Sequence, residues 1–257
     1  MLPPDYVARH LDLDEVDGYV DGPDVDLAYS VVAASDVGVI DIADCTRESV
    51  RSDLANPDAM REEHRLVLTE AGAPVGLLTI ERDLAAKTFF VDSYAVPDHG
   101  RALLPSRVTM GLEAAARLAD EPIRGGLADP PGHTGWKAEA GAFVQDEVYL
   151  DVLQAAGFTE VRRFWHMRIN LGPEHREAPE APKGVTTTIA TTDDDRRLLH
   201  RIDEIAFAEH FGFVPHPFDE WILWFSDRRD ARPDQWWIAW LDDEPVGLCM
   251  LDDSRAD

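Results

Sequence analysis

A Pro-Val-Gly triplet occurs twice in similar surroundings, at residues 74–76 and at residues 245–247. Each copy lies between two apolar stretches, HRLVLTEAGAPVGLLTIERD in one case and WWIAWLDDEPVGLCMLDDS in the other. Two apolar runs around a short turn predict a pair of adjacent β-strands. The copies align without a gap at an offset of 171 residues, from Pro74 to Pro245, which predicts that one structural unit is written twice.

A connector separates the two copies. The stretch GPEHREAPEAPKG is rich in proline and charge and has no apolar residue larger than alanine, so it cannot bury a face. It divides the 257 residues into a first domain at 1–171, a linker at 172–183 and a second domain at 184–257.

Both parts follow the same order of strand, helix, helix, strand, strand. In the second part we expect a strand at 184–191, helices at 192–212 and 217–227, and strands on either side of the second Pro-Val-Gly. Thr192, with Asp195 three residues later, is the expected cap of the first of these helices. The first part begins with a strand at 6–12, a helix that starts near Pro23 and a short helix that Thr46 caps. After the first Pro-Val-Gly strands come a strand at 87–96, a helix at 105–120, a helix at 145–158 and a half-buried strand at 159–171. This series predicts an α/β (α+β) domain with the strands of Leu77 and Val91 adjacent.

Charge and composition exclude some classes of function. Fifty acidic residues against 24 basic residues give a net charge of −26, which argues against nucleic-acid binding. No apolar run approaches a membrane span, and the acidic N-terminus is unlike a signal peptide. Cys45 and Cys249 lack metal-binding spacing, so we expect free thiols, no metal and a cytoplasmic location. The acidic surface either steers cationic substrates toward the protein or only solvates it.

Three stretches resemble the GNAT superfamily of acyl-CoA-dependent acetyltransferases: APVGLLTI, YAVPDHGRALLPSRVTMGLEAAARL and LQAAGFTEVRRFWHMRINL. The resemblance covers residues 1–171 as one complete unit and 184–257 as the N-terminal half of a second. The arrangement is similar to tandem GNAT proteins such as mycothiol synthase, with the second unit truncated. It implies a GNAT-like mixed, mostly antiparallel central sheet flanked by helices, and acetyl-CoA as cosubstrate.

The resemblance also implies a function. We expect an N-acetyltransferase that moves acetyl from acetyl-CoA to a primary amine of a small molecule. The alternative is a non-catalytic, degenerate GNAT module that acts as a scaffold or a CoA-responsive binding domain.

Candidate site residues follow from the family pattern. In that family a strand splays from its neighbour and pairs with the pantetheine, and a Gly-rich turn binds the pyrophosphate. The cofactor-binding residues implied here are Tyr94, Ala95, Val96, Gly100, Arg101, Ala102, Leu103 and Leu104. The second unit suggests an aromatic-walled substrate pocket made of His210, Phe211 and Trp221.

The first unit departs from the family pattern in two places. Its turn has Gly100 as the only glycine, and Pro105 has no N–H to donate. Arg101 and Arg107 either supply charge to phosphates or lie on a solvated helix start. In the family a tyrosine near the end of this helix acts as the general acid, and Leu153 stands at its position here. Tyr149, one helical turn earlier, is the candidate general acid. Glu139 and Glu147 are available carboxylates, and the first unit is expected to be degenerate.

The second unit is expected to expose apolar surface. Without the helices of a complete unit, Trp236, Trp237 and Trp240 would lie exposed on one face together with the strand after Val246. We therefore expect residues 184–257 to dock on the first domain, to form a homodimer with another copy of the chain, or to be poorly ordered.

Overall fold

The structure is a computed structural model, and its described residues fall into two units. It describes residues 2–16, 19–56, 58–119, 135–165, 167, 169, 172–173, 180–226 and 231–252. The first compact unit comprises residues 1–159 and the second residues 160–253. The described residues between 160 and 169, which the sequence assigns to the first domain, cluster with the second unit.

Unit 1 is built on a five-stranded sheet in the order β1-β4-β5-β6-β7. Its strands are β1 (Tyr6–Arg9), β4 (Arg65–Thr69), β5 (Pro74–Asp83), β6 (Thr88–Ala95) and β7 (Lys137–Glu139). All neighbours are antiparallel except β6 and β7, which run parallel. Ile80 of β5 is paired with Val91 of β6, so the predicted adjacency of these strands and the mixed, mostly antiparallel sheet are confirmed.

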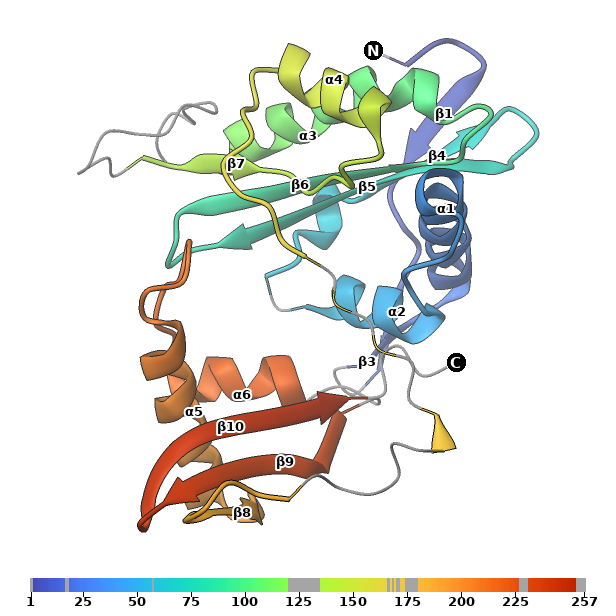
Figure 1. Cartoon of the computed structure of the whole chain (residues 1–257). Helices are drawn as coiled ribbons and strands as arrows, with labels where there is room; N and C mark the ends of the chain where they lie inside the picture. Colours follow the sequence, from blue (N-terminus) through green and yellow to red (C-terminus); the bar gives the residue numbers. More distant parts are fainter. Residues whose placement is uncertain are drawn as a thin grey trace. The chain divides into compact units, whose positions relative to one another are not determined.

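Two helices lie on each face of this sheet (Figure 1). They are α1 (Pro23–Ile40) and α2 (Arg47–Ala55) on one face, and α3 (Leu104–Leu118) and α4 (Glu147–Ala155) on the other. The helix starts are those the sequence predicts: Pro23 and Pro105 lie in first turns, and Thr46 caps α2. Gly157 follows α4 with a positive φ of 95°, which ends that helix.

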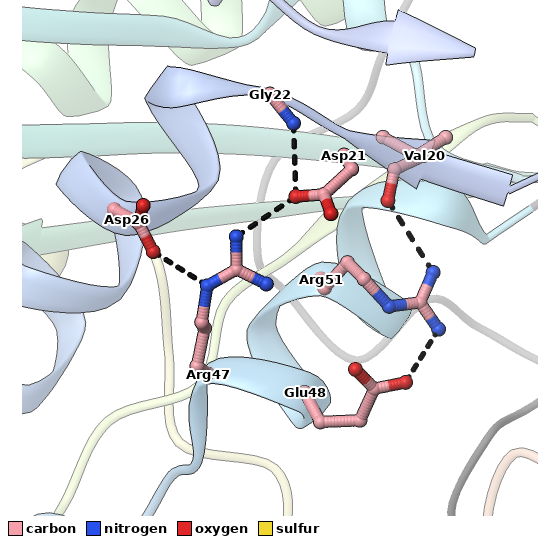
Figure 2. Close-up of polar contacts among 7 residues, drawn as sticks. All are labelled: Val20, Asp21, Gly22, Asp26, Arg47, Glu48 and Arg51. Atoms are coloured by element: carbon pink, nitrogen blue, oxygen red, sulfur yellow. Dashed lines mark hydrogen bonds and ion pairs between the residues drawn. The ribbon is translucent and has the colours of Figure 1, made fainter. Parts of the chain in front are cut away.

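A small hairpin joins β1 to α1 and is tied to α2 by arginines (Figure 2). The hairpin consists of β2 (Asp14–Val16) and β3 (Tyr19–Asp21). Arg47 donates to Asp21 at 2.8 Å and to Asp26 at 2.5 Å. One turn along α2, the buried Arg51 donates to the carbonyl of Val20 at 3.4 Å. These bonds hold the start of α1 against α2.

Unit 2 contains a three-stranded antiparallel sheet in the order β10-β9-β8. Its elements are β8 (Val185–Ile189), α5 (Asp193–Phe207), α6 (Phe218–Ser226), β9 (Ala231–Leu241) and β10 (Glu244–Asp252). Thr192 caps α5 and exchanges bonds with Asp195, as the sequence predicts. The predicted order of strand, helix, helix, strand, strand is present.

The two Pro-Val-Gly segments share a β-bulge. In unit 1 Pro74 pairs with Leu68 and Gly76 with Val67, so Val75 is the extra residue. In unit 2 Pro245 pairs with Trp240 and Gly247 with Ala239, so Val246 is the extra residue. A bulge turns the strand locally and is a defined feature of a sheet. The repeat seen in the sequence therefore extends to strand register.

Two expectations are wrong. No strand forms in the described part of 159–171, where Trp165 is 84% and Met167 is 93% exposed, although apolar residues alternate there. The tryptophans of β9 do not share an exposed face, because successive residues of a strand point to opposite faces. Trp236 is only 2% exposed and packs with Ile238 in the core of unit 2.

The opposite face of this sheet carries exposed apolar side chains. Leu248 and Met250 of β10 pack in the core of unit 2. The alternating Cys249 and Leu251 are exposed, Leu251 at 49%.

Among the helices that the structure describes, none is long and apolar enough to cross a membrane.

Candidate active site

The candidate site of unit 1 lies where β7 ends beside β6. β7 pairs in parallel with residues 88–90, and no further β6–β7 pair follows in this sheet. Leu77 pairs with Tyr94, and the Val96 N–H donates to the carbonyl of Val75. The backbone N–H groups of the even-numbered residues of β6 therefore point toward β5. The N–H groups of Ser93 and Ala95 therefore point to the other edge, the one from which β7 has departed.

A side-chain hydroxyl accepts a hydrogen bond from each of these two N–H groups. Ser93 donates its N–H to the Tyr149 hydroxyl at 3.2 Å, and Ala95 donates its N–H to Ser35 Oγ at 3.3 Å. Tyr149 comes from α4 and Ser35 from α1, so the hydroxyls reach the strand from elements on the two faces of the sheet. A strand edge of this kind has the donors that pair with an added extended chain.

The backbone of Tyr149 is fixed near this edge. Asp146 caps α4 and accepts the Tyr149 N–H at 2.9 Å. The side chain is 5% exposed, and burial raises the pKa of its hydroxyl well above the ordinary value. Leu153, at the position where the resemblance implies a tyrosine, packs in the same apolar cluster as Leu104 and Val108. The structure thus places the Tyr149 hydroxyl, the predicted general acid, on β6.

The turn after β6 uses its own N–H groups to fold. The N–H of Gly100 donates to the Val96 carbonyl, and the N–H of Leu103 donates to the Gly100 carbonyl. The N–H of Leu104 donates to the Arg101 carbonyl. The side chains of Leu103 and Leu104 are buried, at 2% and 1% exposed. Ala102 is exposed. Three amides of the predicted phosphate-binding turn are therefore already bonded to protein carbonyls.

The two arginines near this turn have different surroundings. Arg101 forms an ion pair with Asp146, the cap of α4. Arg107 is completely buried; its Nε donates to Ser93 Oγ at 2.8 Å and its Nη2 donates to the Gly100 carbonyl at 3.2 Å. Burial lowers the pKa of Arg107 to about 10. Arg107 is thus not on a solvated helix start. Its buried guanidinium binds the turn through the Gly100 carbonyl.

Two carboxylates that the sequence did not single out lie on the α1 face of the sheet. Asp92 and Tyr94 alternate with Ser93 along β6, and Asp92 accepts the N–H of Gly141, just beyond β7, at 3.1 Å. Burial raises the pKa of Asp92. Glu81 lies on the same face of β5, and its pKa is raised to about 7 by burial and by the neighbouring acidic residues. Of the two carboxylates that the sequence did offer, Glu139 pairs with Lys137 at 3.5 Å and Glu147 is exposed at the start of α4.

The predicted substrate residues lie in unit 2. His210 has ring contacts with Phe207 and Phe164, at 5.4 Å and 6.0 Å between centroids. Phe211 is 44% exposed. Trp221 is 3% exposed and donates its indole N–H to Asp203 at 2.9 Å, so it packs inside the unit. In the parts of the chain that are described, no three acidic, histidine or cysteine side chains are grouped to hold a metal.

Comparison with solved structures identifies the fold. A GCN5-related N-acetyltransferase from Sphaerobacter thermophilus matches with a TM-score of 0.73 and 21% identity, over 99% of this chain and 74% of that chain. An aminoglycoside antibiotic 6'-N-acetyltransferase from Acinetobacter baumannii matches with a TM-score of 0.36 and 13% identity, over 65% and 99% of the two chains. An aminoglycoside N-acetyltransferase in complex with CoA matches with a TM-score of 0.36 and 12% identity, over 66% of this chain and 100% of that chain. No protein-family model matches the sequence, and a search of curated proteins found no match. The chain therefore has the fold of the Sphaerobacter acetyltransferase.

Proposed function

We propose that this chain is an acyl-CoA-dependent N-acetyltransferase that acetylates a primary amine of a small molecule. The observation that carries the proposal is the departure of β7 from β6, with the Tyr149 hydroxyl on the edge amide of Ser93. Acetyl-CoA would supply the activated thioester. The fold of a GNAT enzyme supports this use of the edge.

The residues along β6 have complementary roles in such a reaction. The N–H groups of Ser93 and Ala95 would pair with the amide groups and the thioester carbonyl of the cosubstrate, and so polarise that carbonyl. The Tyr149 hydroxyl keeps its proton at neutral pH because its pKa is raised, so it can protonate the departing thiolate. The amine nitrogen forms the new C–N bond as the C–S bond breaks.

The proton lost by the amine needs a base, and Asp92 is our candidate. It adjoins Ser93 in the chain and bridges to Gly141 at the point where β7 diverges. Burial raises its pKa, which makes its carboxylate a better proton acceptor. Glu81 adds a second acidic group on the same face, and this favours a cationic amine as acceptor.

The Tyr149→Phe variant tests this assignment. Steady-state transfer from acetyl-CoA to a panel of primary amines, followed by chromatography of the products, should show kcat reduced about 100-fold, a typical loss for a general acid. Tyr29→Phe, a conservative change on α1, is the control and should keep wild-type turnover. Wild-type turnover in Tyr149→Phe would contradict the acid role.

A specific observation favours the second candidate, a non-catalytic module. The amides of Gly100, Leu103 and Leu104 are committed to protein carbonyls, and Arg101 is paired with Asp146. These bonds weaken any pyrophosphate site in the turn. Thermal unfolding separates the candidates: acetyl-CoA raises Tm if unit 1 binds it. An unchanged Tm at millimolar acetyl-CoA, together with no transfer to any amine, would favour the module.

A further inference from the structure

Ser35 interrupts the apolar stripe of α1. The buried side chains Val25, Ala28 and Val32 recur at helical spacing on the inner face of this helix, and Ser35 continues the series one turn later. A hydroxyl at such a position costs free energy unless it is hydrogen-bonded. Its Oγ accepts the Ala95 N–H, so the serine is explained by the edge of β6.

Tyr149 has the same relation to the preceding edge amide. The Tyr149 and Ser35 side chains are 5% and 9% exposed, and each accepts one of two edge N–H groups two residues apart. The distances of 3.2 Å and 3.3 Å are at the long end for N–H···O bonds. These contacts satisfy buried amides, and an acceptor with better geometry can replace them.

We propose that Ser35 and Tyr149 form a pair of internal caps that compete with acyl-CoA for the amides of Ala95 and Ser93, and so determine the affinity of unit 1 for acyl-CoA. This inference rests on the proposed function, because it takes the edge of β6 as the place where acyl-CoA pairs. In the free protein the caps occupy the edge, and on binding the Ala95 and Ser93 amides exchange a hydroxyl for a cosubstrate carbonyl.

Arg107 limits how far β6 can move. It holds Ser93 through Oγ and the turn through the Gly100 carbonyl, so the strand itself stays in place. A hydroxyl can therefore leave the edge only if the side chain of Ser35 or Tyr149 changes its torsion angles. Exchange of caps for ligand is therefore a side-chain event.

Removal of a cap should tighten binding. Ser35→Ala leaves the Ala95 amide without its acceptor in the free protein only, and Tyr149→Phe does the same for Ser93. Isothermal titration of the whole chain with acetyl-CoA should give a Kd about threefold to tenfold lower for each variant, the usual worth of one hydrogen bond. Ser30→Ala is the matched control, since its exposed hydroxyl bonds to Leu27 within α1.

A second measurement reports the caps without ligand. Amide hydrogen exchange followed by NMR should show faster exchange of Ala95 in Ser35→Ala and of Ser93 in Tyr149→Phe, with Ser30→Ala unchanged. An unchanged or higher Kd in both cap variants, when the wild type binds, would overturn the inference alone. Absence of acetyl-CoA binding by the wild type and both variants would overturn the proposed function as well.

Discussion

Glu81 links the stability of unit 1 to pH near neutrality. It lies in β5 with a pKa of about 7, raised by burial and by Asp53, Asp92 and Asp58. A carboxyl group with a folded-state pKa above its unfolded value binds its proton more tightly when folded. Its contribution is therefore full below pH 4.5 and is lost as pH rises through 7.

Glu81→Gln should remove this loss. At pH 8 the variant should exceed the wild type in free energy of unfolding by about 2 kcal/mol, and the difference should shrink as pH falls toward 5. Urea denaturation at several pH values measures the difference. Glu70→Gln, at an exposed turn position, is the control. A difference that does not change between pH 5 and pH 8 would show that Glu81 titrates normally.

At the scale of elements, the two Pro-Val-Gly hairpins have the same bulge in different surroundings. A Cβ on Gly76 would lie 2.2 Å from Arg107 Nη1, because the buried guanidinium packs directly against this glycine. A Cβ on Gly247 would meet only the Ala239 Cβ, at 3.8 Å. The glycine is thus required by a neighbour in unit 1, whereas in the described surroundings of Gly247 there is room for a methyl group.

The glycine-to-alanine pair turns this difference into a prediction. Gly76→Ala should lower the free energy of unfolding by about 1–3 kcal/mol through overpacking. Gly247→Ala should change it by less than about 0.5 kcal/mol. Thermal or urea unfolding of each full-length variant checks this. Equal effects at the two positions would contradict the packing of Arg107 against β5.

Local elements could be predicted from the sequence, and one could not. Helix starts at Pro23, Thr46 and Thr192 depend on neighbouring residues, so capping chemistry predicts them. The strand expected at 159–171 has the right alternation, but a strand also needs a partner edge. Alternation does not say whether an edge is available, and the described residues there form no strand.

At the scale of the molecule, the order of elements was sufficient to predict the fold of unit 1, and the site was only partly predictable. Tyr149 was a candidate because it lies one helical turn before Leu153, the position at which the GNAT resemblance implies a tyrosine. Ser35 and Asp92 could not be found, since each acquires its role from residues far away in sequence: Ser35 bonds to Ala95, and Asp92 bonds to Gly141. For Arg107 the sequence left open a role toward phosphates or a place on a solvated helix start, and its complete burial could not be predicted because charge at a helix start is usually exposed.

Our central proposal is that acyl-CoA pairs with the edge of β6 from which β7 departs. The most direct measurement is an NMR titration of the isotope-labelled chain with acetyl-CoA, following the backbone amides. We expect saturable shifts of the Ser93 and Ala95 amide resonances that are larger than those of Tyr94, whose N–H points to β5. Saturable binding that leaves Ser93 and Ala95 unshifted would contradict it.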